Sequence, residues 1–250
     1  MSAPETLEGW FALHDLRTLD RPAWESLTRH EREKAVAEAS DLMAGAEDVT
    51  DAIAGLSAIY TVVGHKADLL MLHLRPDVAH LHDLERKFDQ TLLASYMSRA
   101  YSYLSVIEVS RHAAPEGTAE NVEDSPYIQA RLYPEMPEHS GYLCFYPMSK
   151  KRLGDDNWYM LDAPQRAELM RDHGRTGRKY AAKVSQIVSG SMGLDDWEWG
   201  VTLFSDDPLQ FKKLVYEMRF DEVSARYAEF GPFYVGRRLE PHEVGRWLGE

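Results

Sequence analysis

Residues 67–76 read ADLLMLHLRP, and residues 197–204 read WEWGVTLF and are followed by Asp207 and Pro208. Both stretches are short and apolar, as strands are. Each precedes a segment with the three- and four-residue spacing of an amphipathic helix. This likeness indicates that the chain consists of two halves built alike.

The segments around the first stretch are expected in the order strand, helix, strand, strand, helix, strand. They are an apolar stretch at 9–13, a helix at 22–45, strands at 56–63 and 69–74, a helix at 77–99 and a strand at 101–110. The segments around the second stretch are expected to repeat this order, although the pattern marks only five of the six. They are a strand at 142–148, a helix at 163–188, a strand at 197–204, a helix at 207–220 and a short strand at 233–237.

This order is the split βαβ, or ferredoxin-like, pattern, and it occurs twice. It predicts an α+β fold in which two ferredoxin-like halves form one body of the dimeric α+β barrel type. The expected boundaries are 1–112 for the first half and 142–250 for the second. Residues 113–141 are rich in proline and polar side chains and are expected to be a linker or a long ordered loop.

The composition limits the classes of function. The formal net charge of −13 argues against a nucleic-acid partner, because duplex binding needs clustered positive charge. The single cysteine, Cys144, excludes an internal disulfide and a multi-cysteine metal site. No stretch approaches the roughly 20 apolar residues of a membrane span. A cytoplasmic location is therefore expected.

Basic residues gather locally in the second half. Lys150, Lys151 and Arg152 are consecutive, and five more cations lie between residues 171 and 183. Such a cluster inside an acidic protein suits a small anionic ligand, although a solvated helix face would have the same composition.

His173 is a candidate metal ligand on the expected helix at 163–188. It lies on one stripe with Leu169, Met170, Gly177, Tyr180 and Val184, so we expect it to face inward. Gly174 and Gly177 each cost a helix about 1 kcal/mol relative to alanine, and they let a flat group approach. Close packing against a sheet, with His173 an ordinary core residue, is the alternative. With no His, Asp or Glu three or four residues further on, a zinc site is not expected, whereas haem iron needs only one such ligand.

Several motifs resemble the coproheme decarboxylases of the chlorite-dismutase-like superfamily. They are YLCFYPMSKKR at 142–152, NWYML at 157–161, HGR at 173–175, GS at 190–191 and LDDWEWGVTLF at 194–204. The resemblance implies a pair of ferredoxin-like domains assembled as a homopentamer. It also implies that iron coproporphyrin III (coproheme) is both substrate and redox cofactor. Hydrogen peroxide would convert two propionates to vinyl groups and give haem b, the last step of a haem pathway, with possible contact to the coproporphyrin ferrochelatase.

The resemblance assigns roles to individual residues. His173 matches the axial ligand of the iron. Tyr146 matches the catalytic tyrosine, which gives an electron and a proton to the oxidised haem and then, as a radical, attacks the reacting propionate. Met148, Ser149 and Lys150 follow Tyr146 toward the strand end and would contact the porphyrin and a reactive propionate. Gln186 matches the distal position. The remaining propionate-binding matches are Arg131, Arg219 and Ser224.

Two alternatives remain open. Within the superfamily, the chain could be a chlorite dismutase or a dye-type peroxidase. However, true chlorite dismutases have a distal arginine where this chain has Gln186, and the pair of Tyr146 and Lys150 also argues against both. The other alternative is a non-catalytic haem or coproheme carrier, which would have no need of Tyr146. His112 is a weak candidate for a second polar group, although a solvated strand end is the simpler interpretation.

Overall fold

The computed structural model describes residues 4–110 and 122–250, so His112 and residues 113–121 lie outside the described residues. The first half of the chain forms strands and helices in the expected order. They are β1 (Thr6–Leu19), α1 (Arg21–Glu25), α2 (Arg29–Glu47), β2 (Leu56–Val62), β3 (Leu69–Arg75), α3 (Val78–Asp89) and β4 (Met97–Ser110).

After β4 the chain forms α4 (Pro126–Leu132), which packs on β1 and β4 through Ile128 and Leu132. The second half then repeats the order of the first. Its elements are β5 (Tyr142–Lys150), α5 (Ala163–Arg178), β6 (Ser185–Gly190), β7 (Trp199–Ser205), α6 (Leu209–Met218), α7 (Glu222–Tyr227), β8 (Ala228–Phe230), β9 (Tyr234–Arg238) and α8 (Val244–Leu248).

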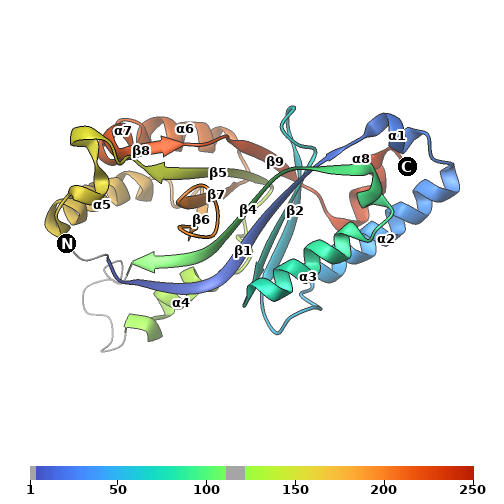
Figure 1. Cartoon of the computed structure of the whole chain (residues 1–250), viewed down its shortest axis with the longest axis horizontal. Coiled ribbons are helices and arrows are strands. Elements are labelled where there is room, and N and C mark those ends of the chain that lie inside the picture. The colour runs from blue at the N-terminus through green and yellow to red at the C-terminus, as the bar shows by residue number, and fades with distance from the viewer. Residues whose placement is uncertain (1–3, 111–121) are drawn as a thin grey trace.

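The strands form a single antiparallel sheet that closes on itself. Its order is β7-β6-β4-β1-β3-β2-β9-β5-β8, and a further pairing between β7 and β5 closes the ring, with β8 attached outside it. Helices cover the outside of this barrel: α2, α3 and α8 lie toward one end and α5, α6 and α7 toward the other (Figure 1). The expected α+β barrel type fold is confirmed.

Alternation along the strands decides which side chains reach the barrel interior and which face the helices. On β5, Leu143 and Phe145 belong to the interior core, together with Tyr60, Leu72 and Tyr103 from the first half. Successive strand residues point to opposite faces, so Cys144 and Tyr146 face outward, toward α5 and α6. The sequence of β5 thus places its tyrosine on the helix-covered wall.

The two halves differ in how tightly their first long helix packs on the barrel. Helix α2 begins at a Thr28–Glu31 capping box and buries Ala35, Ala39 and Met43. Helix α5 begins at an Asp162–Gln165 capping box, yet none of its residues is buried. Helix α5 is therefore packed less tightly in the second half than α2 is in the first.

Two expected helices are too long. The expected helix at 163–188 ends at Arg178, and residues 185–190 instead form β6, which pairs with β7 along its whole length. The expected helix at 77–99 ends at Asp89, and residues 97–110 are strand. Arg99, expected in that helix, lies on β4 and forms ion pairs with Glu85 and Asp89 on α3.

Strand β1 is longer than the apolar stretch at 9–13. Polar residues that interrupt the apolar pattern are buried in it, among them His14, Asp15 and Arg17. The Arg17 guanidinium donates to both carboxylate oxygens of Asp15 and to Asp89 on α3. Charged residues can occupy this strand because they neutralise one another beneath a helix.

Candidate functional site

Tyr146 lies on the outer wall of the barrel, in an apolar cluster that also contains Val201, Leu203 and Phe211. Its ring stacks on Phe233 with 4.4 Å between centroids, and Phe230 lies at 5.9 Å. Burial raises the pKa of the Tyr146 phenol. The phenol is therefore held protonated among aromatic rings at neutral pH.

His173 is half-buried on α5, and its Nδ1 lies 3.1 Å from Oδ1 of Asp221. Burial lowers the pKa of His173; the nearby Lys150 adds to this, whereas Asp221 opposes it. A neutral imidazole whose Nδ1–H donates to a carboxylate presents its Nε2 lone pair to a metal. We infer this tautomer from the hydrogen bond to Asp221.

Asp221 joins three elements at this site. It is the N-cap of α7, and one of its oxygens accepts a bond from the Ser224 backbone N–H at 3.2 Å while the other accepts from the Ser224 hydroxyl at 3.0 Å. The same carboxylate bonds His173 on α5. It also stabilises the charged form of Lys150, at the end of β5. Sequence reasoning missed Asp221, although its position three residues before Ser224 is typical of a helix N-cap.

Lys150 is buried at the end of β5, beyond the part of the strand that pairs with β7, and it pairs with Ala228 of β8. Burial lowers its pKa to about 8, although Asp221 and Glu198 favour the charged form. Its ammonium lies 4.6 Å from the centroid of the Trp158 ring, and its backbone N–H donates to the Glu198 carboxylate at 2.7 Å. Lys150 is thus a cation held in an apolar setting.

Arg219 follows the last residue of α6, and its guanidinium carbon lies 3.6 Å from the centroid of Phe230. Since Phe230 also contacts Tyr146, this arginine borders the tyrosine's aromatic cluster. The structure therefore places five predicted site residues in two sets: His173, Lys150 and Ser224 lie around Asp221, and Tyr146 and Arg219 both contact Phe230.

Gln186 lies on β6 and not on the expected helix, which corrects its local structure. It pairs in register with Leu203 of β7, and paired residues share a face of the sheet, so Gln186 lies on the same outer wall as Tyr146. It is exposed there. Gln186 on this wall and His173 on α5 would therefore contact a ligand between them from opposite sides.

The remaining predicted residues are less closely tied to the site. Met148 is half-buried beside the Tyr146 cluster, and the Ser149 hydroxyl accepts a bond from the Glu198 backbone N–H at 3.2 Å. Arg131 lies in the last turn of α4 with its guanidinium carbon 5.8 Å from the Tyr127 ring, on a helix that packs against β1 and β4. No contact joins Arg131 to His173 or Tyr146 in the described residues.

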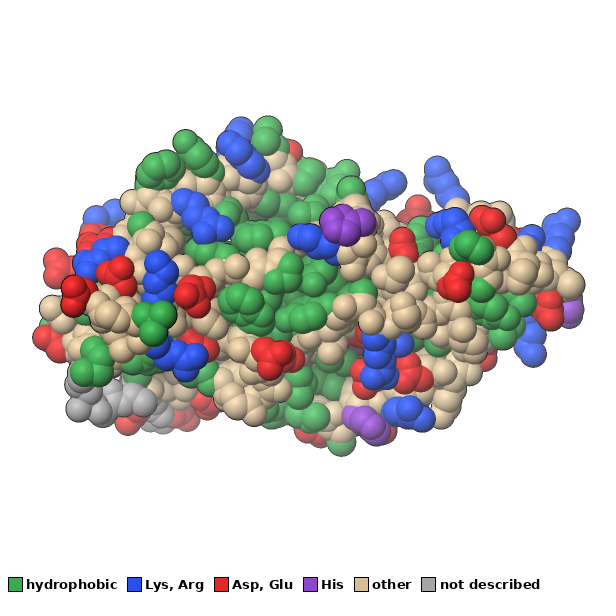
Figure 2. Space-filling model, turned by 45° about the horizontal axis from the view of Figure 1, so that its top comes forward, with side chains coloured by type: hydrophobic (Ala, Val, Ile, Leu, Met, Phe, Trp, Pro, Cys, Tyr) green, Lys and Arg blue, Asp and Glu red, His purple; other side chains and the backbone are tan. Residues whose placement is uncertain are grey.

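The surface of the second half is apolar at its centre. Hydrophobic side chains gather in the middle of the face shown in Figure 2, and basic and acidic side chains lie around them. Among the described residues, no group of three or more His, Cys, Asp or Glu side chains could hold a metal ion.

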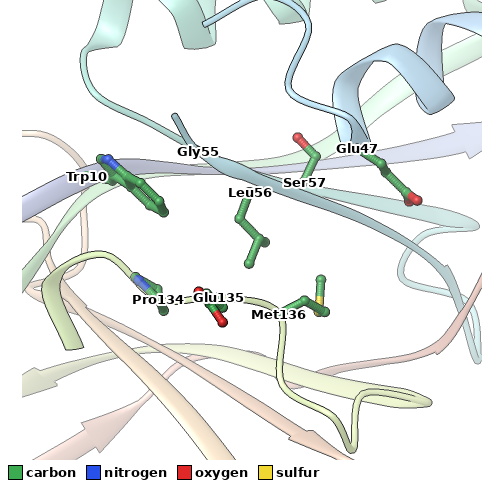
Figure 3. Close-up of a pocket in the computed structure, with 8 residues that line it drawn as sticks. All are labelled: Trp10, Glu47, Gly55, Leu56, Ser57, Pro134, Glu135 and Met136. Atoms are coloured by element: carbon green, nitrogen blue, oxygen red, sulfur yellow. The ribbon is translucent and has the colours of Figure 1, made fainter. Parts of the chain in front are cut away.

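A separate cleft of about 250 Å³ lies at one end of the barrel (Figure 3). It contains none of the predicted site residues. Its lining consists of Trp10, Glu47, Gly55, Leu56, Ser57, Pro134, Glu135 and Met136. Tyr146 and His173 lie elsewhere on the molecule.

Comparison with known proteins places this geometry in a family. A protein described as a novel heme-binding protein from Thermus thermophilus is 50% identical, with both chains fully covered and a TM-score of 0.91. A variant of chlorite dismutase from Candidatus Nitrospira defluvii is 20% identical over 97% of this chain and 96% of its own, with a TM-score of 0.77, which shows a shared fold. The chlorite dismutase family model matches residues 32–239. The chain belongs to the chlorite dismutase family.

Proposed function

We propose that the protein is a hydrogen-peroxide-dependent coproheme decarboxylase. The observation that supports the proposal is the placement of three groups: the His173 imidazole and the buried Lys150 ammonium lie near Asp221, and the buried Tyr146 phenol lies on the same face of β5 as Lys150. The first suits an axial ligand of ferric iron, the second a propionate and the third a one-electron relay.

The space beside α5 fits a porphyrin. No residue of α5 is buried, and a Cβ added to Gly177 would meet nothing within 4 Å. Gly174 is nearly as open, with only an Arg178 nitrogen at 3.4 Å. Close packing on the sheet therefore does not account for these glycines. A flat apolar group whose iron takes one protein ligand would fit beside α5.

The side chains of this wall have separate tasks in the proposed reaction. His173 would hold the iron through Nε2 while Asp221 fixes the ring by accepting from Nδ1–H. Lys150 would hold one propionate carboxylate beside Tyr146, and Arg219 and Ser224 would contact the others. Arg131 is proposed as a further propionate ligand from the resemblance alone.

The bound iron porphyrin supplies the oxidising equivalents when peroxide is present. Tyr146 gives up an electron and a proton and then, as a radical, removes a hydrogen atom from the propionate carbon that becomes part of the vinyl group. Each propionate, one peroxide and one proton give a vinyl group, carbon dioxide and two waters. The apolar wall around Tyr146 excludes water from the radical.

The relatives and one residue favour this function over the alternatives. The Thermus protein is described as heme-binding, which supports a porphyrin ligand here. Gln186 is neutral, so it cannot provide the distal positive charge of a chlorite dismutase. A carrier would need no buried phenol beside a propionate-binding lysine. We further propose that the enzyme works in the cytoplasm as a homopentamer and receives coproheme from a coproporphyrin ferrochelatase.

A titration tests the proposal. Purified protein loaded with coproheme receives hydrogen peroxide stepwise, and the porphyrin is weighed by mass spectrometry. We expect two successive losses, each equal to one formic acid. His173→Ala should lose both the histidine-ligated ferric spectrum and this turnover. An unchanged porphyrin mass in the wild-type protein would rule out the decarboxylase, and an unchanged spectrum in His173→Ala would assign the iron to another ligand.

A further inference from the structure

Helix α6 exposes a face that combines large apolar side chains with lysines. Leu209, Tyr216 and Phe220 are 51%, 58% and 74% exposed. With a helical period of 3.6 residues, they share one side of the helix and its end with Lys212 and Lys213, and that side carries no acidic residue. The opposite side is the packed one, with Phe211 and Leu214 buried against the barrel. We call these five exposed residues the α6 outer face.

The aromatic side chains of the α6 outer face are arranged as one raised patch. Tyr216 and Phe220 meet edge to face with 5.2 Å between centroids, and the Lys212 ammonium lies 4.5 Å from the centroid of Tyr216. On the view in Figure 2, hydrophobic and basic side chains lie next to each other along the upper edge. Aromatic rings beside lysines are the combination that enters the headgroup region of a bilayer.

The second part of α5 and the residues that follow it add positive charge beside the α6 outer face. Residues 171–183 carry five exposed cations and one carboxylate, Asp172. The one acidic residue within α6, Glu217, is turned away toward α5, where it binds Lys179 and the Tyr180 hydroxyl. Asp206 and Asp207 lie before α6, and Asp207 is close enough to Lys213 and Lys183 to interact with them, so it offsets part of their charge. The neighbourhood of the α6 outer face is therefore basic in a chain of net charge −13.

The acidity of the rest of the chain does not prevent contact with a negative surface. Exposed charges farther apart than about 8 Å are largely screened at physiological salt, so the nearest side chains decide the interaction. Each lysine or arginine close to an anionic bilayer contributes about 1 kcal/mol. An acidic chain with one basic and aromatic face would bind in a single orientation.

We propose that the α6 outer face docks the protein on an anionic lipid surface, with Tyr216 and Phe220 entering the headgroup layer and the cations of α5 and α6 facing the lipid phosphates. This inference does not depend on the proposed reaction. The face adjoins the candidate site, because Arg219, which precedes Phe220 in the chain, lies over the Phe230 ring that contacts Tyr146. An apolar porphyrin could therefore pass between the site and the bilayer without crossing bulk water.

Vesicle sedimentation tests the docking directly. The full chain is mixed with vesicles of equal parts phosphatidylglycerol and phosphatidylcholine, or of phosphatidylcholine alone. We expect binding to the anionic vesicles, loss of binding in high salt and no binding to the neutral ones. Wild-type protein that stays in the supernatant with anionic vesicles at low salt would overturn the proposal, as would equal binding to both vesicles.

Two pairs of variants locate the surface. Tyr216→Ser with Phe220→Ser, and Lys212→Glu with Lys213→Glu, should each reduce partitioning more than about tenfold, which corresponds to about 1.4 kcal/mol. The matched controls are Ile53→Ser with Val63→Ser, at positions that are 99% and 71% exposed elsewhere, and Lys34→Glu with Lys87→Glu on α2 and α3. These should bind as the wild type does.

A size-exclusion run of each variant gives the competing outcome. If the Tyr216 and Phe220 variant changes oligomeric size while remaining folded by circular dichroism, the α6 outer face is a contact between copies, and the lipid proposal is wrong. Equal losses in the control variants would likewise reject this face as the docking surface.

Discussion

The phenol of Tyr146 can be removed without disturbing its packing. Phenylalanine keeps the stacking on Phe233 and the contact with Phe230 while it removes the O–H. Tyr146→Phe should therefore bind coproheme as the wild type does and lose decarboxylation by about a hundredfold or more. Mass spectrometry after peroxide addition measures the loss. Tyr142→Phe, on the same strand and face, is the control and should keep its turnover. Full turnover in Tyr146→Phe would remove the tyrosine from its proposed role.

Lys150 should make coproheme binding depend on pH. Burial lowers its pKa from 10.5 to about 8, so the ammonium that would hold a propionate is present below pH 8 and is lost as the pH rises through that value. A bound carboxylate favours the charged form, so the midpoint in the complex lies above that of the free protein.

We expect the dissociation constant for coproheme to rise about tenfold or more between pH 7 and pH 10, as a charge-assisted bond worth about 1.5–3 kcal/mol is lost. Absorbance titrations across this range measure it. Lys150→Gln should bind weakly throughout with little slope, and Lys151→Gln, its neighbour, should keep the wild-type slope. A slope that persists in Lys150→Gln would point to another titrating group.

Helix α5 should respond to a ligand more than any other long helix of the molecule. None of its residues is fully buried in the protein alone, whereas α2 buries four of its residues against the barrel. Without porphyrin, the amides of α5 should exchange hydrogen much faster than those of α2. Coproheme should slow exchange in α5 and leave α2 unchanged, as measured by mass spectrometry of peptides. Equal protection of both helices without ligand would mean that α5 packs firmly by itself.

Sequence reasoning predicted the elements that local signals mark and missed those that depend on contacts between distant residues. Helix α5 begins at Ala163 as expected, with Asp162 as its N-cap and Pro164 in its first turn, because caps are local signals. Strand β6 was hidden inside an expected helix; it pairs with the next strand, β7, and with β4, which lies far away in the sequence. Asp221 also escaped notice. Its link to His173 joins residues 48 positions apart, and only the folded chain brings them together.

Two strand pairings, which we call seams, join the halves of the chain into one barrel. On one side β2 pairs with β9, and on the other β4 pairs with β6, so each half completes the sheet of the other. The ion pair between Glu47 and Arg238 and the bond from the Tyr60 hydroxyl to the Ser140 carbonyl cross the first seam. Neither half can bury its interior face alone, since Tyr60 and Phe145 share one core. The barrel should therefore unfold as one cooperative unit.

A single methyl group at the first seam tests this cooperativity. A Cβ on Gly236 of β9 would lie 2.8 Å from Cβ of Tyr60 and 3.2 Å from the Thr61 carbonyl oxygen on β2. Gly236→Ala should force the two strands apart and lower the free energy of unfolding by about 1–3 kcal/mol. Hydrogen exchange in increasing urea should show that peptides of α2 and α6 lose protection together, at the same lower urea concentration. Gly177→Ala, where the new methyl meets open space, should not lower stability. If only α6 lost protection in Gly236→Ala, the halves would be separate folding units that the seams merely hold side by side.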